Sequence, residues 1–119
     1  MKQKDVLGQT GEKIAATYLQ NKGYKILERN WRGRFGEIDI IAQEKNQIVF
    51  VEVKARQSKD FGLPEEAVDF KKQNKLVRTA LEYLQKNPTK LSFRFDVIGI
   101  EFKSFSNYKI SHIKNAFLR

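Results

Sequence analysis

Apolar positions recur with two different periods along this chain, and the change of period divides it into helices and strands. Residues 7–22 and 69–85 carry apolar side chains at helical spacing, which predicts two amphipathic helices. Runs rich in Ile, Val and Phe, bounded by polar residues, predict strands. The predicted strands cover residues 24–32, 35–43, 48–56, 92–102 and 108–113. The expected order is therefore helix, three strands, helix and two strands.

The helical spacing also predicts which face of each helix is buried. The first face consists of Leu7, Gly11, Ile14, Ala15 and Tyr18, and the second of Leu76, Val77, Ala80, Leu81 and Leu84. Asp5 and Asp69 precede the two helices, where an acidic side chain can accept hydrogen bonds from the first turn. Gly23 suits the position just after a helix end.

Short connections between the first three strands predict an antiparallel meander, with a hairpin turn at Lys45 and Asn46. The second helix would carry the chain across to a further strand. A polar stretch with Gly62 and Pro64 predicts an exposed loop before that helix. The third strand is apolar on both faces, which favours the centre of the sheet. We therefore expect one domain over residues 1–119, an α/β or α+β sheet covered by helices.

The third predicted strand, IVFVEVKAR, contains an acid and a base among apolar residues. Strand side chains alternate between faces, so Glu52 and Lys54 share one face near the end of the strand. A charge in a buried strand is costly unless it is paired. A simple salt bridge where the strand meets water and a functional site both explain the two charges, and this strand alone favours neither.

The preceding strand supplies another acid. GEIDII is expected to place Ile38 and Ile40 on one face and Glu37 and Asp39 on the other. If the two strands pair through the turn, residues whose numbers sum to about 91 or 92 lie opposite each other, as strand pairing requires. Asp39 then lies opposite residue 52 or 53. Asp39 and Glu52 can therefore meet, with the lysine of the third strand beside them.

Two converging carboxylates repel each other unless a cation lies between them. The chain has no cysteine and one histidine, so oxygen ligands favour Mg²⁺, or Mn²⁺, over zinc. A neighbouring Lys54 could stabilise charge on a phosphate or orient an attacking water. Asp39, Glu52 and Lys54 thus form a minimal set for metal-assisted phosphodiester hydrolysis. Glu12, on the first helix, could complete this site or could simply be a favourable charge in a helix's first turns.

Charge is the strongest feature of the composition. The chain has 23 Lys and Arg against 14 Asp and Glu, a formal net charge of +9. This favours polyanionic partners, with nucleic acid first and an anionic membrane surface second. No apolar run approaches the roughly 20 residues of a membrane span, and the start carries no apolar signal segment. A cytoplasmic location without membrane association is therefore expected. The absence of cysteine excludes disulfides, zinc–thiolate sites and a cysteine nucleophile.

Several basic residues are candidates for nucleic-acid contact: Arg34, Arg56, Lys71, Lys72 and Lys75. Lys71, Lys75 and Arg78 form a basic stripe on the second helix, and Lys72 is adjacent to it. A solvated helix face is the alternative explanation for the stripe. Trp31 and Phe35 are interleaved with arginines. Arginines beside aromatic residues suit contact with distorted or single-stranded nucleic acid, although Trp31 is more typical of core packing.

Two further polar residues are expected to be structural. Asp96 interrupts the apolar strand RFDVIGI and is placed to anchor Arg94 or a neighbouring lysine. His112 is the only histidine and lies far from the acidic motif in sequence. We therefore expect both to lie in hydrogen-bonded structural positions rather than on a metal.

The motifs GEKIAATYLQNKGYKILERNWR, GEIDIIA, VFVEVKAR and RFDVIGI together resemble the YraN-like family of small bacterial proteins, classed as predicted endonucleases. The resemblance runs from about Gly8 to Phe117. That family is similar in turn to archaeal Holliday-junction resolvases and to the wider restriction-endonuclease-like, PD-(D/E)xK, fold. The resemblance implies the α/β class, with an αβββαβ core and a central mixed sheet flanked by helices. It also implies that metal is bound at the end of the central hairpin.

Carried onto this sequence, the resemblance makes Asp39 the acid of the second strand, Glu52 and Lys54 the (D/E)xK pair, and Glu12 the acid of the first helix. Ile38 stands where the superfamily motif has proline. The implied function is a metal-dependent DNA endonuclease, with branched or structured DNA as the substrate suggested by resolvases. Because resolvases are dimers, a homodimer stays open.

Two alternatives to an enzyme remain. One is a non-catalytic nucleic-acid-binding module with a nuclease-like fold, acting in a DNA repair, recombination or uptake complex. The other is a basic structural protein whose carboxylates are all in salt bridges. The clustering of unlike charges in otherwise apolar strands disfavours this last alternative.

Overall fold

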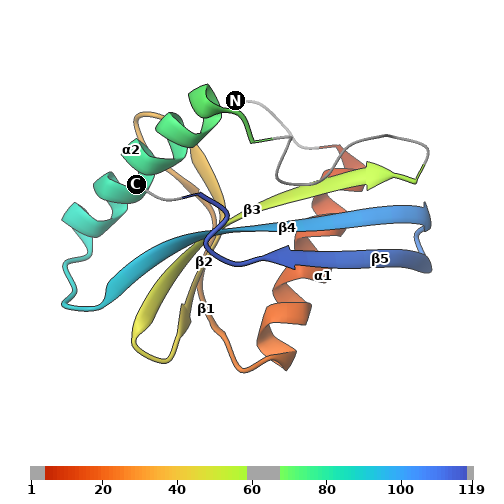
Figure 1. Ribbon diagram of the computed structural model, residues 1–119, viewed down its shortest axis with the longest axis horizontal. Helices are drawn as coiled ribbons and strands as arrows, with labels where there is room; N and C mark the ends of the chain where they lie inside the picture. The colour runs from red at the N-terminus through yellow and green to blue at the C-terminus, as the bar shows by residue number, and fades with distance from the viewer. Residues whose placement is uncertain (1–4, 59–67, 118–119) are drawn as a thin grey trace.

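The structure is a computed structural model that describes residues 5–58 and 68–117. In these ranges the chain forms one five-stranded sheet and two helices (Figure 1). The elements are α1 (Val6–Asn21), β1 (Lys25–Arg32), β2 (Glu37–Glu44), β3 (Gln47–Gln57), α2 (Phe70–Lys86), β4 (Ser92–Ser104) and β5 (Asn107–Ile113). This order confirms the sequence prediction. The loop predicted around Gly62 and Pro64 lies outside the described residues.

The strands lie side by side in the order β1-β2-β3-β4-β5, which makes β3 the central strand as predicted. β1, β2 and β3 form an antiparallel meander with a turn at Lys45 and Asn46. The chain then crosses over through α2 and continues into β4, which pairs in parallel with the whole length of β3. The sheet is therefore mixed, and the class α/β is confirmed.

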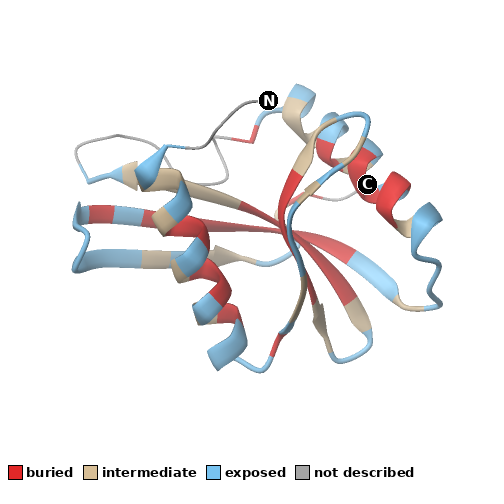
Figure 2. Ribbon diagram, turned by 180° about the vertical axis from the view of Figure 1, so that it is seen from behind, coloured by how far each residue is buried: buried red, intermediate tan, exposed pale blue. Residues whose placement is uncertain are grey.

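Alternate residues of the central strands belong to two separate cores, one under each helix. Val49 and Val51 pack with α1, whereas Ile48 and Phe50 pack with α2. Figure 2 shows the buried residues along the middle of the sheet and on both helices. A strand that is buried on both faces in this way must be apolar at every position except where a polar group has a partner. Within the described ranges, no helix is long and apolar enough to cross a membrane.

The helix ends follow the predicted capping pattern. The Asp5 carboxylate accepts the backbone N–H of Gly8 at 2.7 Å, and Asp69 accepts that of Lys72 at 2.8 Å. Gly23 has a φ of 93°, which glycine adopts at little cost. On α1, Gly11 packs so closely on β3 that an added Cβ would lie 2.7 Å from the Cβ of Ala55. Glycine at this position therefore sets the distance between α1 and the sheet.

The predicted buried face of α2 is wrong at one position. Leu81 is 50% exposed, whereas Thr79 and Tyr83 are buried. The sheet contact is centred on Leu76, Ala80 and Tyr83, which places Leu81 on the outer side of the helix. The helical period could not reveal this, because polar Thr79 and aromatic Tyr83 replace an aliphatic residue on the packed side.

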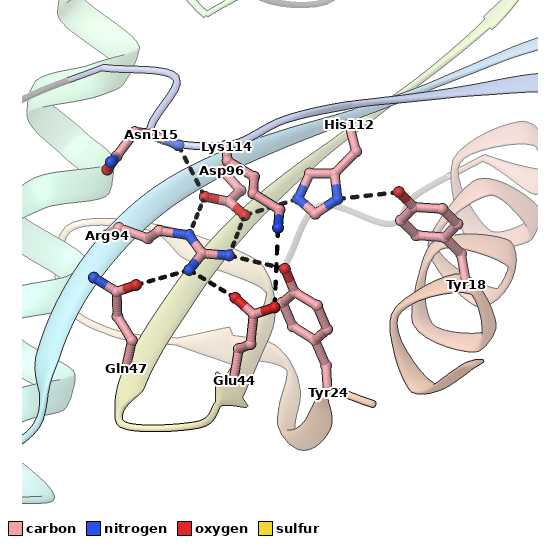
Figure 3. A network of polar contacts seen from close by, with 9 residues as sticks. All are labelled: Tyr18, Tyr24, Glu44, Gln47, Arg94, Asp96, His112, Lys114 and Asn115. Carbon is pink, nitrogen blue, oxygen red and sulfur yellow. Dashed lines mark hydrogen bonds and ion pairs between the residues drawn. The ribbon is translucent and has the colours of Figure 1, made fainter. Parts of the chain in front are cut away.

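A buried ion pair joins the sheet to α1 and to the β2–β3 hairpin (Figure 3). The Arg94 guanidinium donates to both Asp96 oxygens, at 2.9 and 3.1 Å. It also donates to Glu44, Gln47 and Tyr24, at 2.9, 2.7 and 2.8 Å. This arrangement confirms the predicted anchoring of Arg94 by Asp96.

His112 of β5 extends this network from the other side of Asp96. Its Nε2 lies 2.8 Å from Asp96 Oδ2, and its Nδ1 lies 3.2 Å from the Tyr18 hydroxyl of α1. Asp96 also accepts the backbone N–H of Asn115 at 3.1 Å. Burial alone would raise the pKa of Asp96, but the hydrogen bonds from His112 and Arg94 outweigh it and lower that pKa. Asp96 is thus a fully paired structural carboxylate, as the sequence indicated for it and for His112.

We expect Asp96→Asn to lower the free energy of unfolding by about 3 kcal/mol, because it leaves the buried Arg94 guanidinium without its bidentate partner. Urea unfolding at pH 7 measures this change. Glu101→Gln, an exposed change on the same strand, serves as the control and should stay within about 0.5 kcal/mol of the wild type. Equal stability of the two variants would show that the Arg94 network contributes little.

Candidate functional site

The candidate site lies where β2 and β3 separate. Their ladder runs from Glu44 opposite Gln47 to Ile40 opposite Val51. One step further, the Asp39 carboxylate accepts the backbone N–H of Val53 at 2.8 Å. A side chain of β2 thus takes the place of a backbone carbonyl at the point of separation. Asp39 lies opposite residues 52 and 53, as the sequence predicted.

The path of β2 changes at Asp39 and corrects one sequence prediction. Ile40 lies in the core under α1, whereas Ile38 lies in the core under α2, so the two do not share a face. Asn30 lies between the β1 partners of Ile40 and Ile38, and its φ of 52° departs from extended strand geometry. Strict alternation requires a regular ladder, and this irregularity breaks it beside Asp39.

Glu52 is the second carboxylate of the site and is almost completely buried, with 6% of its surface exposed. Burial, followed by the charge of Asp39 and a hydrogen bond to it, raises the pKa of Glu52 to about 8. Asp39 is itself only 7% exposed. The structure therefore brings the two predicted acids together in a setting that disfavours two negative charges.

Lys72 of α2 forms an ion pair with the Glu52 carboxylate. The charge of Glu52 outweighs the effect of burial and raises the pKa of Lys72. The sequence placed Lys72 beside the basic stripe of α2, as a candidate for nucleic-acid contact. In the structure its ammonium group reaches the predicted catalytic acid. No local pattern marks this pair, because its members come from different elements on either side of residues 59–67.

Lys54 lies at the same end of β3 and is partly buried. Burial, and next the charge of Lys72, lower the pKa of Lys54, while Glu52 and Asp39 act in the opposite direction. A lysine with a lowered pKa exchanges protons more readily near neutral pH. Asp39, Glu52 and Lys54 therefore interact electrostatically, with Lys72 as an additional member that sequence reasoning missed.

Glu12 is 4% exposed and belongs to the packed side of α1. The neighbouring Gly11 packs on Ala55, one residue beyond Lys54. This contact brings the first turns of α1 to the end of β3 that carries the site. A buried carboxylate at that location is consistent with a role at the site, and the close approach of Gly11 is what puts it there.

Asp39 and Glu52 supply the oxygen donors for which Mg²⁺ and Mn²⁺ are suited, since Mg²⁺ commonly takes one or two protein carboxylates and completes its shell with water and phosphate. Among the described residues, no group of three or more His, Cys, Asp or Glu side chains is arranged to hold a metal ion. The donor set thus fits a two-carboxylate site of the magnesium type and no larger cluster.

The other candidates for nucleic-acid contact differ in how far they are exposed to solvent. Lys71 and Lys75 are exposed on α2, and Arg34 is exposed on the turn between β1 and β2. Arg56 is partly buried near the end of β3. Trp31 packs edge-on against Tyr83 at 5.3 Å between ring centroids, in agreement with its expected role in packing.

Comparison with known proteins identifies relatives over almost the whole chain. The profile described as "Uncharacterised protein family UPF0102" matches residues 11–100. A UPF0102 protein of Caldanaerobacter subterraneus subsp. tengcongensis is 53% identical over 117 residues, which cover 96% of each chain. A UPF0102 protein of Clostridium botulinum strain 657 is 54% identical over 114 residues, or 93% of each chain. These matches confirm the predicted resemblance at the level of the family.

We expect opposite changes in the pKa of Glu52 when its two neighbours are altered in metal-free buffer. Lys72→Met should raise this pKa above about 8, because it removes the positive charge that favours ionised Glu52. Asp39→Asn should lower it, because it removes the like charge. A ¹³C NMR titration of the side-chain carboxyl carbons measures both shifts.

Lys71→Met is the matched control for Lys72→Met, since Lys71 precedes it on α2 and is exposed. This control should leave the titration of Glu52 unchanged. An equal shift in both lysine variants would mean that Glu52 senses the general charge of α2 and not a specific ion pair.

Proposed function

We propose that this chain, which belongs to the UPF0102 family, is a metal-dependent DNA endonuclease of the restriction-endonuclease-like, PD-(D/E)xK, type. The observation that carries the proposal is the meeting of two buried carboxylates, Asp39 and Glu52, on neighbouring strands with Lys54 beside them. A buried acid whose pKa is strongly raised beside a second acid, as that of Glu52 is beside Asp39, is typical of functional sites.

Asp39 and Glu52 would hold one Mg²⁺ or Mn²⁺ ion, which supplies Lewis-acid stabilisation of a phosphoryl oxygen. The hydrogen bond from Val53 N–H holds the Asp39 carboxylate in a fixed orientation. Burial restricts Glu52 in the same way. Glu12, on the packed side of α1 near the same end of β3, is proposed as a catalytic acid beside this two-carboxylate centre and not as a metal ligand.

Lys54 is proposed to act on the water and the phosphate. Its lowered pKa suits a group that orients the attacking water and accepts or shares its proton. In the protonated state its ammonium group stabilises negative charge on the phosphate. Hydrolysis then forms a bond between the water oxygen and phosphorus and breaks one phosphorus–oxygen bond of the DNA backbone.

The surface around the site supports DNA as the substrate. Lys71, Lys75 and Arg34 are exposed, and with Arg56 they supply positive charge in a chain of net charge +9. Such residues neutralise phosphates and make binding weaken steeply as salt increases. Branched or otherwise structured DNA as substrate and a homodimer belong to the proposal through the resemblance to resolvases. Work with repair or recombination proteins and a cytoplasmic location remain expectations from the sequence.

A second candidate function is a nucleic-acid-binding module without catalysis, and the Lys72–Glu52 ion pair favours it. The ammonium group of Lys72 lies on a carboxylate that the nuclease needs for metal. If Lys72 remains there, it satisfies Glu52 permanently and the fold serves only to bind DNA or RNA. In the nuclease, by contrast, Lys72 must release Glu52 to the metal.

We expect cleavage of at least one of four DNA substrates, namely forked, nicked, four-way and linear, when Mg²⁺ or Mn²⁺ is present and EDTA is absent. Asp39→Asn and Glu52→Gln should each reduce the cleavage rate by at least about 100-fold, because each removes a charged group at the reacting phosphate. Gel analysis of end-labelled DNA measures the rates. Titration calorimetry with Mn²⁺ measures the accompanying loss of metal affinity.

Glu28→Gln is the control for these variants, since Glu28 is an exposed carboxylate on β1. It should cut and bind Mn²⁺ like the wild type. Salt-sensitive binding of DNA without cleavage under any condition would establish the binding module instead. Normal cleavage by both Asp39→Asn and Glu52→Gln would refute the assigned site.

A further inference from the structure

The turn between β1 and β2, residues 33–36, carries an exposed aromatic side chain on a rigid support. Phe35 is 44% exposed. The N–H of Gly33 donates to the carbonyl of Gly36 at 2.8 Å, which closes the turn. Gly36 has a φ of 155°, a conformation suited to glycine. Phe35 therefore projects from a short closed turn.

The buried carboxylate of Glu82 fastens this turn to α2, beside which it lies in Figure 1. Its Oε1 accepts the backbone N–H of Arg34 at 2.8 Å, and its Oε2 lies 3.3 Å from the Lys86 ammonium. The hydrogen bond from Arg34 lowers the pKa of Glu82, which keeps it ionised at neutral pH. An added Cβ on Gly33 would lie 2.5 Å from Oε1 and would have to displace this carboxylate. A buried charge thus holds an exposed aromatic residue in place.

Two arginines from different elements meet at the Phe35 ring. The guanidinium carbon of Arg34 lies 5.8 Å from the ring centroid, and that of Arg78 on α2 lies 5.6 Å away. They border an open groove of about 240 Å³, lined by Arg34, Phe35, Arg78, Leu81, Glu82 and Gln85. Leu81, which the helical pattern placed in the core, is an exposed apolar residue of this groove, as is Phe35.

Internal stability does not account for this arrangement. An exposed cation–π contact stabilises a protein by only about 0.5–1 kcal/mol. The arrangement leaves the apolar side chains of Phe35 and Leu81 exposed to water beside two positive charges. Flat aromatic and guanidinium groups that adjoin an apolar groove form a platform on which a nucleobase stacks, and the same guanidinium groups can pair with its phosphates. A base inside a duplex is already stacked on both faces, so this platform suits an unpaired one.

We infer that Arg34, Phe35 and Arg78 form a stacking site for an unpaired nucleotide of DNA, so that the protein selects substrates in which single-stranded DNA adjoins a duplex. This inference rests on the proposed function, because it relates the stacking site to the proposed point of cleavage. Phe35 precedes Asp39 by four residues, or at most about 13 Å of strand. This distance corresponds to about four base steps of duplex. The inferred site thus lies next to the proposed point of cleavage.

The test measures binding without cleavage, in EDTA, by fluorescence anisotropy of two labelled duplexes, one blunt and one with a single-stranded overhang. Wild type should bind the overhang duplex more tightly. Phe35→Leu should weaken that binding by about 5- to 100-fold, the range for loss of one stacked base, and leave the blunt duplex unaffected. Phe35→Trp should retain the preference, because it keeps an aromatic face.

Phe105→Leu is the matched control, since Phe105 is 59% exposed on the turn between β4 and β5 and no arginine of the described ranges lies over its ring. It should bind both duplexes like the wild type. A second readout is the fluorescence of 2-aminopurine placed as the unpaired base next to the duplex, which falls when the base stacks. This decrease should be lost in Phe35→Leu, and an unchanged urea midpoint should show that the variant is folded.

Equal binding of the overhang duplex by wild type and Phe35→Leu would overturn the inference, as would an unquenched 2-aminopurine signal in the wild type. A matching loss of affinity for poly-glutamate in Phe35→Leu would also overturn it, because the surface would then bind any polyanion. These outcomes are separate from those for the nuclease. A protein that stacks the base but cuts no DNA would refute the catalytic proposal alone.

Discussion

The hydrogen bond from Val53 N–H to the Asp39 carboxylate is the contact on which both the sheet and the candidate site depend. β2 and β3 cease to pair at Ile40 and Val51, and a buried N–H beyond that point needs another acceptor. Asp39 satisfies it, and its carboxylate is thereby held opposite Glu52. The same interaction that completes the central ladder therefore creates a pair of neighbouring acids. A polar group that is required for folding at this point also defines the chemistry available there.

Two buried carboxylates of this protein lie in opposite electrostatic environments. Asp96 accepts hydrogen bonds from Arg94, His112 and Asn115, and these lower its pKa in spite of burial. Glu52 is buried to a similar extent but faces another acid, and its pKa is raised to about 8. Paired charges of the first kind stabilise a unique packing of strands and helix. Acids of the second kind, which face each other, reduce stability, and this is why Asp39 and Glu52 are the proposed metal ligands.

Different faces of helix α2 contact three parts of the molecule. Leu76, Ala80 and Tyr83 pack on the sheet, Lys72 reaches Glu52, and Glu82 holds the turn that carries Phe35. Arg78 extends beside that aromatic ring. A shift of this helix along the sheet would change the acid pair and the β1–β2 turn together. The candidate site and the inferred stacking site are therefore coupled through one rigid element.

Much of the fold follows directly from the local sequence, because periodicity, capping acids and the hairpin turn are properties of neighbouring residues. The central place of β3 also follows, because its residues are apolar on both faces. The approach of Asp39 to Glu52 follows as well, since the register of a tight hairpin is determined by its turn. The sequence pattern failed at Ile38 and Leu81, and it did not reveal the ion pair between Lys72 and Glu52. In each case the outcome depends on a distant contact: the separation of β2 from β3, the packing of Tyr83, and the reach of α2 to Glu52. Contacts between residues far apart in the chain leave no periodic signal, so the partner of the acid pair and the fixed position of Phe35 emerge only once the helix lies on the sheet.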